Sequence, residues 1–377
     1  MKHTRSLLAT LVAAAICTPA LADINIGVST ALSGPAASLG VPVKSALALW
    51  PTEIAGQKVV LTVLDDAADP TTATKNARRF VEEKMDAIMG AANTPATIAI
   101  AQVANEAKIP QLSPSPAELP EGKDAWTFRS VMHAAYFTEG LVEDMKKRGV
   151  KSVGFLGYTD AYGETYLQAL QKQAPAAGFK ITAVERFTRA DTSVAGQTLK
   201  VVASNPDAIL VVAVGAGAAL PQKAIVERGY KGKIYHTSAS ISPDFLRLAG
   251  KDAEGALVSS GPEQLPDQMP ASHPGKAVAE KFYKDYEAKF GKGTVTQFAA
   301  NVYDLGLVLE KAVPVALKKA QPGTQEFRQA LRDAIETTGG VATTKGILKF
   351  TPTDHWGRTA EARTMLIVKN GDWQLAP

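Results

Sequence analysis

Cysteine is almost absent from this chain, whose 377 residues include only Cys17. No disulfide framework and no cysteine-based metal site can therefore stabilise the residues that follow it. Long apolar runs are missing too, because no stretch after residue 22 approaches the ~20 apolar residues that a membrane-spanning helix needs. We expect the body of the chain to depend on hydrophobic cores and not to insert into a membrane.

The chain also lacks an excess of charge of one sign. It contains 41 Lys and Arg residues against 37 Asp and Glu residues, which gives a formal net charge of +4. Basic residues are interspersed with acidic ones, and no run of like charges stands out. This distribution argues against nucleic acid or an anionic membrane surface as the main partner.

Signatures of enzymes, cofactor sites and metal sites are missing as well. The histidines have no metal-ligand spacing, and neither a Gly-x-Ser-x-Gly elbow nor a Walker loop occurs. Asp65, Asp66 and Asp69 lack the glycine and distal glutamate of a calcium loop. Residues 214–217 begin like a dinucleotide fingerprint, but Leu220 stands at the place of the third glycine. We predict no catalytic residues, no cofactor and no metal.

Residues 1–22 have the pattern of a secretory signal peptide. Lys2 and Arg5 precede an apolar run over residues 7–16, and Ala20 and Ala22 supply the small residues of a cleavage site. We predict cleavage after Ala22 and a periplasmic mature chain. That chain is long enough for two domains of ordinary size.

Apolar strands and amphipathic helices alternate along the remaining chain, which predicts an α/β fold with parallel sheets covered by helices on both faces. The alternation restarts near residue 150, so two sheets are expected. The predicted strands cover residues 24–32, 59–64, 87–90, 111–113 and 127–131, then 152–157, 180–186, 208–214, 233–237 and 256–259. Three helices follow, at 275–290, 296–316 and 324–337. The chain is predicted to end in a hairpin that pairs 347–350 with 362–369.

The first strand ends in Ser33-Gly34-Pro35 and passes into an alanine-rich helix. A buried parallel strand that ends this way delivers its carboxyl end to a ligand crevice, and the new helix offers free N–H groups to an anion. Together with the Leu-Asp-Asp-Ala-Ala-Asp-Pro stretch at 64–70, this junction resembles the periplasmic solute-binding proteins of the leucine/isoleucine/valine-binding family. These are type I periplasmic binding proteins of ABC importers.

The resemblance implies two doubly wound parallel-sheet lobes joined by a three-segment hinge. By that likeness, lobe I comprises residues 23–137 and 262–352, and lobe II comprises 138–261 and 353–377. It also implies a monomer that captures a small ligand between its lobes by hinge closure and presents it to an ABC importer permease. Two alternatives stay open: a periplasmic sensory module on the same fold, and a secreted hydrolase, which the missing nucleophile motif disfavours.

The stretch from Gly90 to Thr97 is the most informative candidate site. Thr94 followed by Pro95 has the pattern of an N-cap residue and a proline at the first helical position. The residues alone allow either a simple cap or a hydroxyl that faces the crevice and binds an anion. The resemblance implies the second, because Thr94 falls where the family has its carboxylate-binding serine, with Ala92 and Asn93 as wall residues.

The resemblance assigns further cleft residues. Ser115 matches a position that contacts the ligand, whereas Ala117 stands where a threonine is usual, so one hydroxyl contact is missing. Leu39 falls where the leucine binder has a tyrosine. Tyr162 lies in the family's Tyr-Gly pair at a helix start, where the residues alone also allow a packing role, and Phe298 corresponds to an aromatic residue facing the cleft.

Two positions indicate what kind of ligand the cleft takes: Ser238 suggests a ligand without an amine, and Val214 suggests a roomier pocket. Ser238 stands where the leucine binder has the glutamate that pairs with the ligand's ammonium, and a hydroxyl cannot offset the desolvation of that charge. Val214 replaces a bulky aromatic residue and leaves more room. The Leu-Trp-Pro at 49–51 also resembles the branch associated with aromatic and other non-amino acids. We predict a small carboxylate, an aromatic acid first, with a branched-chain or other amino acid as the alternative. Asp160 is the one acid that could still reach an ammonium.

Overall fold

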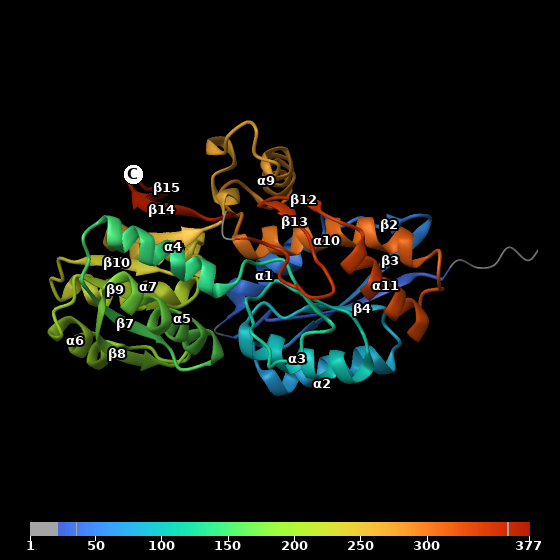
Figure 1. The fold of residues 1–377 in the computed structure, drawn as a ribbon, viewed down its shortest axis with the longest axis horizontal. Helices are drawn as coiled ribbons and strands as arrows, with labels where there is room; N and C mark the ends of the chain where they lie inside the picture. The colour runs from blue at the N-terminus through green and yellow to red at the C-terminus, as the bar shows by residue number, and fades with distance from the viewer. Residues whose placement is uncertain (1–21, 35, 360–361) are drawn as a thin grey trace, which may run out of the picture.

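The fold is described from a computed structural model that covers residues 22–34, 36–359 and 362–377. Residues 1–21, which hold most of the predicted signal peptide, lie outside the described residues. The chain forms two lobes side by side, each built on a sheet with helices on its faces (Figure 1). This architecture confirms the predicted α/β class with two parallel-sheet lobes.

The sheet of lobe I has the order β2-β3-β1-β4-β5-β6. Its five parallel strands are β1 (Ile24–Thr30), β3 (Gln57–Asp65), β4 (Ala87–Gly90), β5 (Gln111–Ser113) and β6 (Thr127–Arg129), and β2 (Glu53–Ile54) pairs antiparallel with β3. In the register of the sheet, Ile26 lies between Leu61 and Ala87. Strand β1 is central and almost entirely buried, as expected for a strand with helices on both faces.

The sheet of lobe II has the order β15-β14-β11-β10-β9-β7-β8. The parallel strands are β7 (Ser152–Tyr158), β8 (Lys180–Phe187), β9 (Ala208–Val212), β10 (Lys233–His236) and β11 (Leu257–Ser260). Strands β14 (Thr364–Lys369) and β15 (Asp372–Leu375) extend the sheet in antiparallel fashion.

The predicted hairpin between 347–350 and 362–369 is wrong. Strand β13 (Gly346–Leu348) pairs with β12 (Val341–Thr343), and β14 pairs with β11 and β15. The reason is local turn chemistry. Asn370 and Gly371 both have positive φ angles, 57° and 77°, and an Asn-Gly pair favours the two-residue turn of a tight hairpin. Strand β14 therefore pairs with β15 across this turn.

The helices of lobe I come from two parts of the chain. They are α1 (Ala37–Leu47), α2 (Pro70–Glu82) and α3 (Thr94–Ala107), then α9 (Lys276–Phe290), α10 (Gln297–Ala316) and α11 (Gln325–Thr337). Helix α10 packs on both α1 and α11, so the late helices complete the first lobe (Figure 1).

The helices of lobe II follow the alternation with its strands. They are α4 (Ala134–Lys147), α5 (Ala161–Ala177), α6 (Ala195–Ala203), α7 (Ala216–Glu227) and α8 (Pro243–Ala249). Short 3₁₀ turns lie at η1 (Ser238–Ser240), η2 (Gly250–Ala253), η3 (Pro262–Gln264) and η4 (Pro266–Gln268). In the part of the chain that the structure describes, no helix is both long enough and apolar enough to cross a membrane.

The chain passes between the lobes three times, between β6 and α4, between β11 and α9, and between β13 and β14. The residue boundaries given above for the lobes stay predictions.

A cluster of four buried charged side chains, which we call the hinge cluster, joins these three crossings. Arg358 Nη2 lies 2.8 Å from Asp304 Oδ2, and Arg358 Nε donates to the carbonyl oxygen of Ser130 at 2.7 Å. Lys345 Nζ lies 3.4 Å from Glu263 Oε1 and 3.6 Å from Asp304 Oδ2. Ser130, Glu263 and Arg358 belong to the first, second and third crossings.

Candidate ligand-binding cleft

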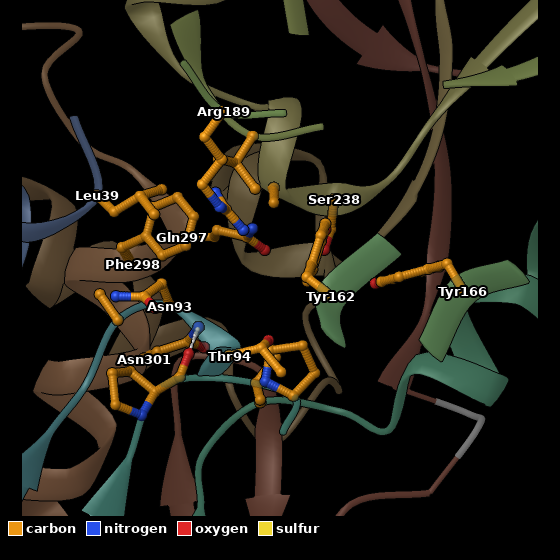
Figure 2. A pocket seen from close by; sticks show the side chains of 16 residues that line it. Leu39, Asn93, Thr94, Tyr162, Tyr166, Arg189, Ser238, Gln297, Phe298 and Asn301 are labelled. Carbon is orange, nitrogen blue, oxygen red and sulfur yellow. Dashed lines mark hydrogen bonds between the residues drawn. The ribbon is translucent and has the colours of Figure 1, made fainter. Parts of the chain in front are cut away.

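A small cavity, lined by residues of both lobes, lies between the lobes. Most of its wall comes from segments that directly follow β4 and β5 in lobe I and β8, β9 and β10 in lobe II, together with the starts of α5 and α10. The carboxyl ends of parallel strands thus face each other across the cavity, which is the usual place for a ligand in open α/β sheets. Figure 2 shows the lining side chains from both lobes pointing toward this space.

The structure brings the predicted site residues together. The cavity is lined by Leu39, Ala92, Asn93, Thr94, Tyr162, Val214, Ser238 and Phe298. Ser115 does not line it but lies directly behind Thr94, and the two hydroxyl oxygens are 3.2 Å apart. Sequence reasoning therefore predicted the location of the cleft. The roles of these residues in binding a ligand stay predictions.

The predicted N-cap of α3 is wrong by one residue. Asn93 is the cap, because its Oδ1 accepts a hydrogen bond from the backbone N–H of Ala96 at 3.0 Å. Thr94 is the first helical residue and Pro95 the second. Asparagine is at least as good a cap as threonine, and taking that role leaves the Thr94 hydroxyl to pair with Ser115. A capping role for Thr94 is thereby excluded.

Two buried amides in the cavity wall have a polar atom without a partner. Asn93 Nδ2 and Asn301 Oδ1 make no hydrogen bond to any described residue. The Asn93 amide is oriented by its cap, and the Asn301 amide by donation to the carbonyl oxygen of Pro114 at 3.3 Å. An unpaired buried polar group costs about 1–3 kcal/mol. The wall on the lobe I side thus offers a guest one donor and one acceptor.

Tyr162 presents its ring rather than its hydroxyl. The Tyr162 hydroxyl donates to Thr237 Oγ1 at 2.7 Å, and the ring packs against Tyr166 with the centroids 5.1 Å apart. Burial raises the pKa of Tyr162 and of Tyr166 above the ordinary tyrosine value, so both phenols stay neutral. The structure thereby places Tyr162 as a neutral aromatic wall of the cavity.

Asp160 and Arg189 form an ion pair that sequence reasoning did not predict. Asp160 Oδ1 caps α5 by accepting from the N–H groups of Tyr162 and Gly163 at 3.0 and 3.3 Å. Its Oδ2 lies 2.6 Å from Arg189 Nε. Arg189 follows β8, lines the cavity, and lies over the ring of Tyr158 at 4.3 Å. The available signal was that β7 and β8 are neighbours, so the residues that follow them meet.

The remaining wall is apolar, with Leu39, Val131, Val214 and Phe298 among its residues. Of the described residues that line the cavity, Arg189 alone is charged. Across the described ranges, no group of three or more His, Cys, Asp or Glu side chains could hold a metal ion. The chemistry of this lining therefore suits a small guest with an apolar body and polar groups at its edges.

Comparisons with known proteins agree with this geometry. The family profile described as "Periplasmic binding protein" matches residues 23–371. An extracellular ligand-binding receptor from Rhodopseudomonas palustris is 48% identical, with a TM-score of 0.92 over 95% of this chain and 100% of that one. The Leu/Ile/Val-binding protein homolog 1 of Brucella suis biovar 1 is 22% identical over 334 residues, which is 83% of this chain and 86% of that protein.

A third similar protein was solved with a ligand. It is the solute-binding protein of an ABC transporter from R. palustris in complex with benzoate, and it is 18% identical with a TM-score of 0.78 over 94% of this chain and 95% of that one. At this identity the likeness concerns the fold. The two-lobe fold, the interlobe cavity and the profile match across nearly the whole described chain lead to one conclusion: this chain belongs to the type I periplasmic binding proteins, the leucine/isoleucine/valine-binding family of periplasmic ligand-binding receptors.

Proposed function

We propose that this protein is the solute-binding receptor of an ABC importer and that it captures a small carboxylate without an α-amine, preferably an aromatic acid. The observation that carries the proposal is the charge of the cavity wall. Its one charged residue among those described is a cation, Arg189. Asp160 already pairs with this cation, and no carboxylate is among the described lining residues, so the wall gives a guest's ammonium group no counter-charge.

The start of α3 is the proposed carboxylate site. The Thr94 hydroxyl, the free Asn93 Nδ2 and the N-terminus of this 14-residue helix all lie on the lobe I side of the cavity. Hydroxyl, amide and helix N-terminus are each suited to an anion. Ser115 supports the arrangement by its contact with the Thr94 hydroxyl.

An amino acid would leave its ammonium group without a counter-charge. Asp160 is the only nearby acid that the sequence suggested, and both of its carboxylate oxygens are engaged, one by the α5 cap and the other by Arg189. Ser238 supplies a hydroxyl where the leucine binder has a glutamate. Because an unpaired buried ammonium costs several kcal/mol, these contacts support a ligand without an amine.

Hinge closure is the proposed mechanism of capture. The two sides of the cavity belong to different lobes, so a guest touches both only when the cleft is shut. Binding then shifts the population toward the closed form by its additional affinity for that form. The permease is proposed to recognise this closed shape.

The names of the relatives favour a second candidate, an amino-acid receptor. The Brucella relative is named for leucine, isoleucine and valine, whereas the R. palustris structure contains benzoate. Both are distant in sequence, so neither decides the ligand of this protein.

Titration decides between the two candidates. Protein that has been unfolded, freed of ligand and refolded is expected to bind benzoate with a micromolar dissociation constant, about −8 kcal/mol, in isothermal titration calorimetry. We expect no heat with leucine, because its ammonium finds no partner. Micromolar leucine binding together with no response to benzoate would replace the proposal with the amino-acid receptor.

Substitution of Thr94 tests the carboxylate site. Thr94→Ala is expected to weaken benzoate binding by about 1.5–3 kcal/mol, the range for a hydrogen bond to a charged group. Because Asn93 rather than Thr94 caps α3, no cap is lost, and removal of the buried Thr94–Ser115 hydrogen bond should lower stability by about 1 kcal/mol. Calorimetric titration and thermal unfolding measure the two effects.

Thr324→Ala is the matched control, because Thr324 is a true threonine cap whose Oγ1 accepts from the N–H of Phe327 at 3.1 Å. It lies away from the cavity and should lose about 1 kcal/mol of stability with unchanged affinity. Equal affinity of Thr94→Ala and the wild type would remove Thr94 from the site.

A further inference from the structure

We propose that Arg189 forms a second polar anchor that binds a neutral oxygen at the end of the ligand opposite its carboxylate. The ligand class is then an acid with a hydroxyl or carbonyl group at its far end. The inference rests on the proposed function, since it assumes that the carboxylate lies at the start of α3.

The Nη1 and Nη2 groups of Arg189 are donors that remain available to a ligand. Its Nε is committed to Asp160 at 2.6 Å, and no described residue accepts a hydrogen bond from its Nη1 or Nη2. The guanidinium plane is held on the other side by the ring of Tyr158, 4.3 Å away. A guanidinium that is stacked and paired on one edge is fixed in orientation, so its remaining N–H groups present a preorganised fork. Figure 2 shows this group reaching into the cavity beside Gln297.

The charge of this anchor is already balanced. Asp160 neutralises Arg189, and the Arg189 side chain is only 19% exposed. A second carboxylate placed here would add an uncompensated negative charge to a largely desolvated ion pair. A hydroxyl or carbonyl oxygen can accept from the guanidinium without that cost. The arrangement therefore selects a neutral oxygen.

The two anchors lie on opposite sides of the cavity. Thr94 and Asn93 belong to lobe I, whereas Arg189 belongs to lobe II, and Figure 2 shows them across the cavity from each other. Leu39, Phe298 and other apolar residues of the wall complete the enclosure. A guest that fits has an apolar body with an oxygen function at each end. Because each end contacts a different lobe, both contacts form together only when the cleft closes.

Calorimetry on the refolded, ligand-free protein tests the second anchor with a pair of probes. The wild type is expected to bind para-hydroxybenzoate at least about tenfold more tightly than benzoate, because a hydrogen bond to a charged donor corresponds to that factor in affinity. The isomer ortho-hydroxybenzoate has its hydroxyl beside the carboxylate, so its affinity should exceed that of benzoate by less than about threefold. This comparison needs no variant. Equal affinity for benzoate and its para-hydroxy derivative would overturn the proposal.

Substitution of Arg189 then tests whether this residue causes the preference for para-hydroxybenzoate over benzoate. Arg189→Met should reduce the preference for the para-hydroxy acid over benzoate to less than about threefold, and this ratio is the readout whatever the variant's affinity for benzoate itself. If that variant fails to fold, Arg189→Lys keeps the charge beside Asp160 but lacks the fork, and should lose the preference as well. Arg186→Met is the matched control, because Arg186 forms a partly exposed pair with Glu164 and should keep the wild-type ratio.

The outcomes separate the two ideas. A preference that survives in Arg189→Met or Arg189→Lys would overturn the role of Arg189 while the carboxylate receptor stands. Binding of leucine with no binding of any of the three acids would overturn the proposed function, and the second anchor with it.

Discussion

Arg358→Met is expected to lower the free energy of unfolding by about 3–5 kcal/mol, the cost of removing one partner from a buried ion pair. Both partners are fully buried, and Arg358 holds Asp304 Oδ2 at 2.8 Å and the Ser130 carbonyl at 2.7 Å. Burial lowers the pKa of Arg358, and the charge of Asp304 partly offsets this. Without the guanidinium, Asp304 keeps only Thr344 and the more distant Lys345. Urea unfolding followed by circular dichroism measures the loss.

The matched control is Arg363→Met in the same part of the chain. Arg363 pairs with Glu139 and Glu143, whose side chains are 47% and 52% exposed, so the change should cost less than about 1 kcal/mol. Adding Asp304→Asn to Arg358→Met should cost less than the sum of the two single changes, because the two residues share one interaction. Equal losses for Arg358→Met and Arg363→Met would mean that the hinge cluster contributes no more than a surface ion pair.

Gly163→Ala is expected to destabilise the protein by about 2–3 kcal/mol, at the upper end of the range for overpacking. A Cβ at this position would lie 1.8 Å from the backbone carbonyl oxygen of Tyr158. That atom cannot move away as a flexible side chain could. The start of α5 must shift instead, and with it Tyr162 in the cavity wall. We therefore expect weaker benzoate binding as well as a lower melting temperature.

The same substitution at Gly196 should stabilise the protein instead of destabilising it. Gly196 is the second residue of α6, and a Cβ there would meet no atom within 4 Å. Alanine is the better helix former, so Gly196→Ala should raise stability by about 0.5–1 kcal/mol. If both variants were stabilised, the contact with Tyr158 would not be what requires glycine in the Tyr162-Gly163 pair.

The location of the cleft could be predicted because it follows from the alternation of strands and helices. In a parallel sheet every strand ends at the same edge, so Asn93 after β4 and Ser238 after β10 had to lie at sheet edges that carry ligands. The family resemblance then placed Leu39 and Phe298 at the same site. Those residues all line one cavity.

The partners of individual polar groups could not be predicted in the same way. Whether Asn93 or Thr94 caps α3 depends on side-chain reach at one helix start, where both residue types are good caps. The contact of Asp160 with Arg189 depends on the pairing of β7 with β8. The predicted pairing of 347–350 with 362–369 is wrong because the Asn370-Gly371 turn pairs β14 with the strand that directly follows it.

The sequence by itself determined the class of fold, the two sheets and most strand positions, because hydrophobic periodicity and turn residues act over a few neighbouring positions. Only the tertiary structure decided which charges are available to a ligand. Asp160 and Arg189 are 29 residues apart, and Arg358 and Asp304 are 54 apart. A pattern of local spacing does not reveal such pairs. Their electrostatic interaction depends on distance and burial in the folded chain, and these arise only when the sheets and crossings are assembled.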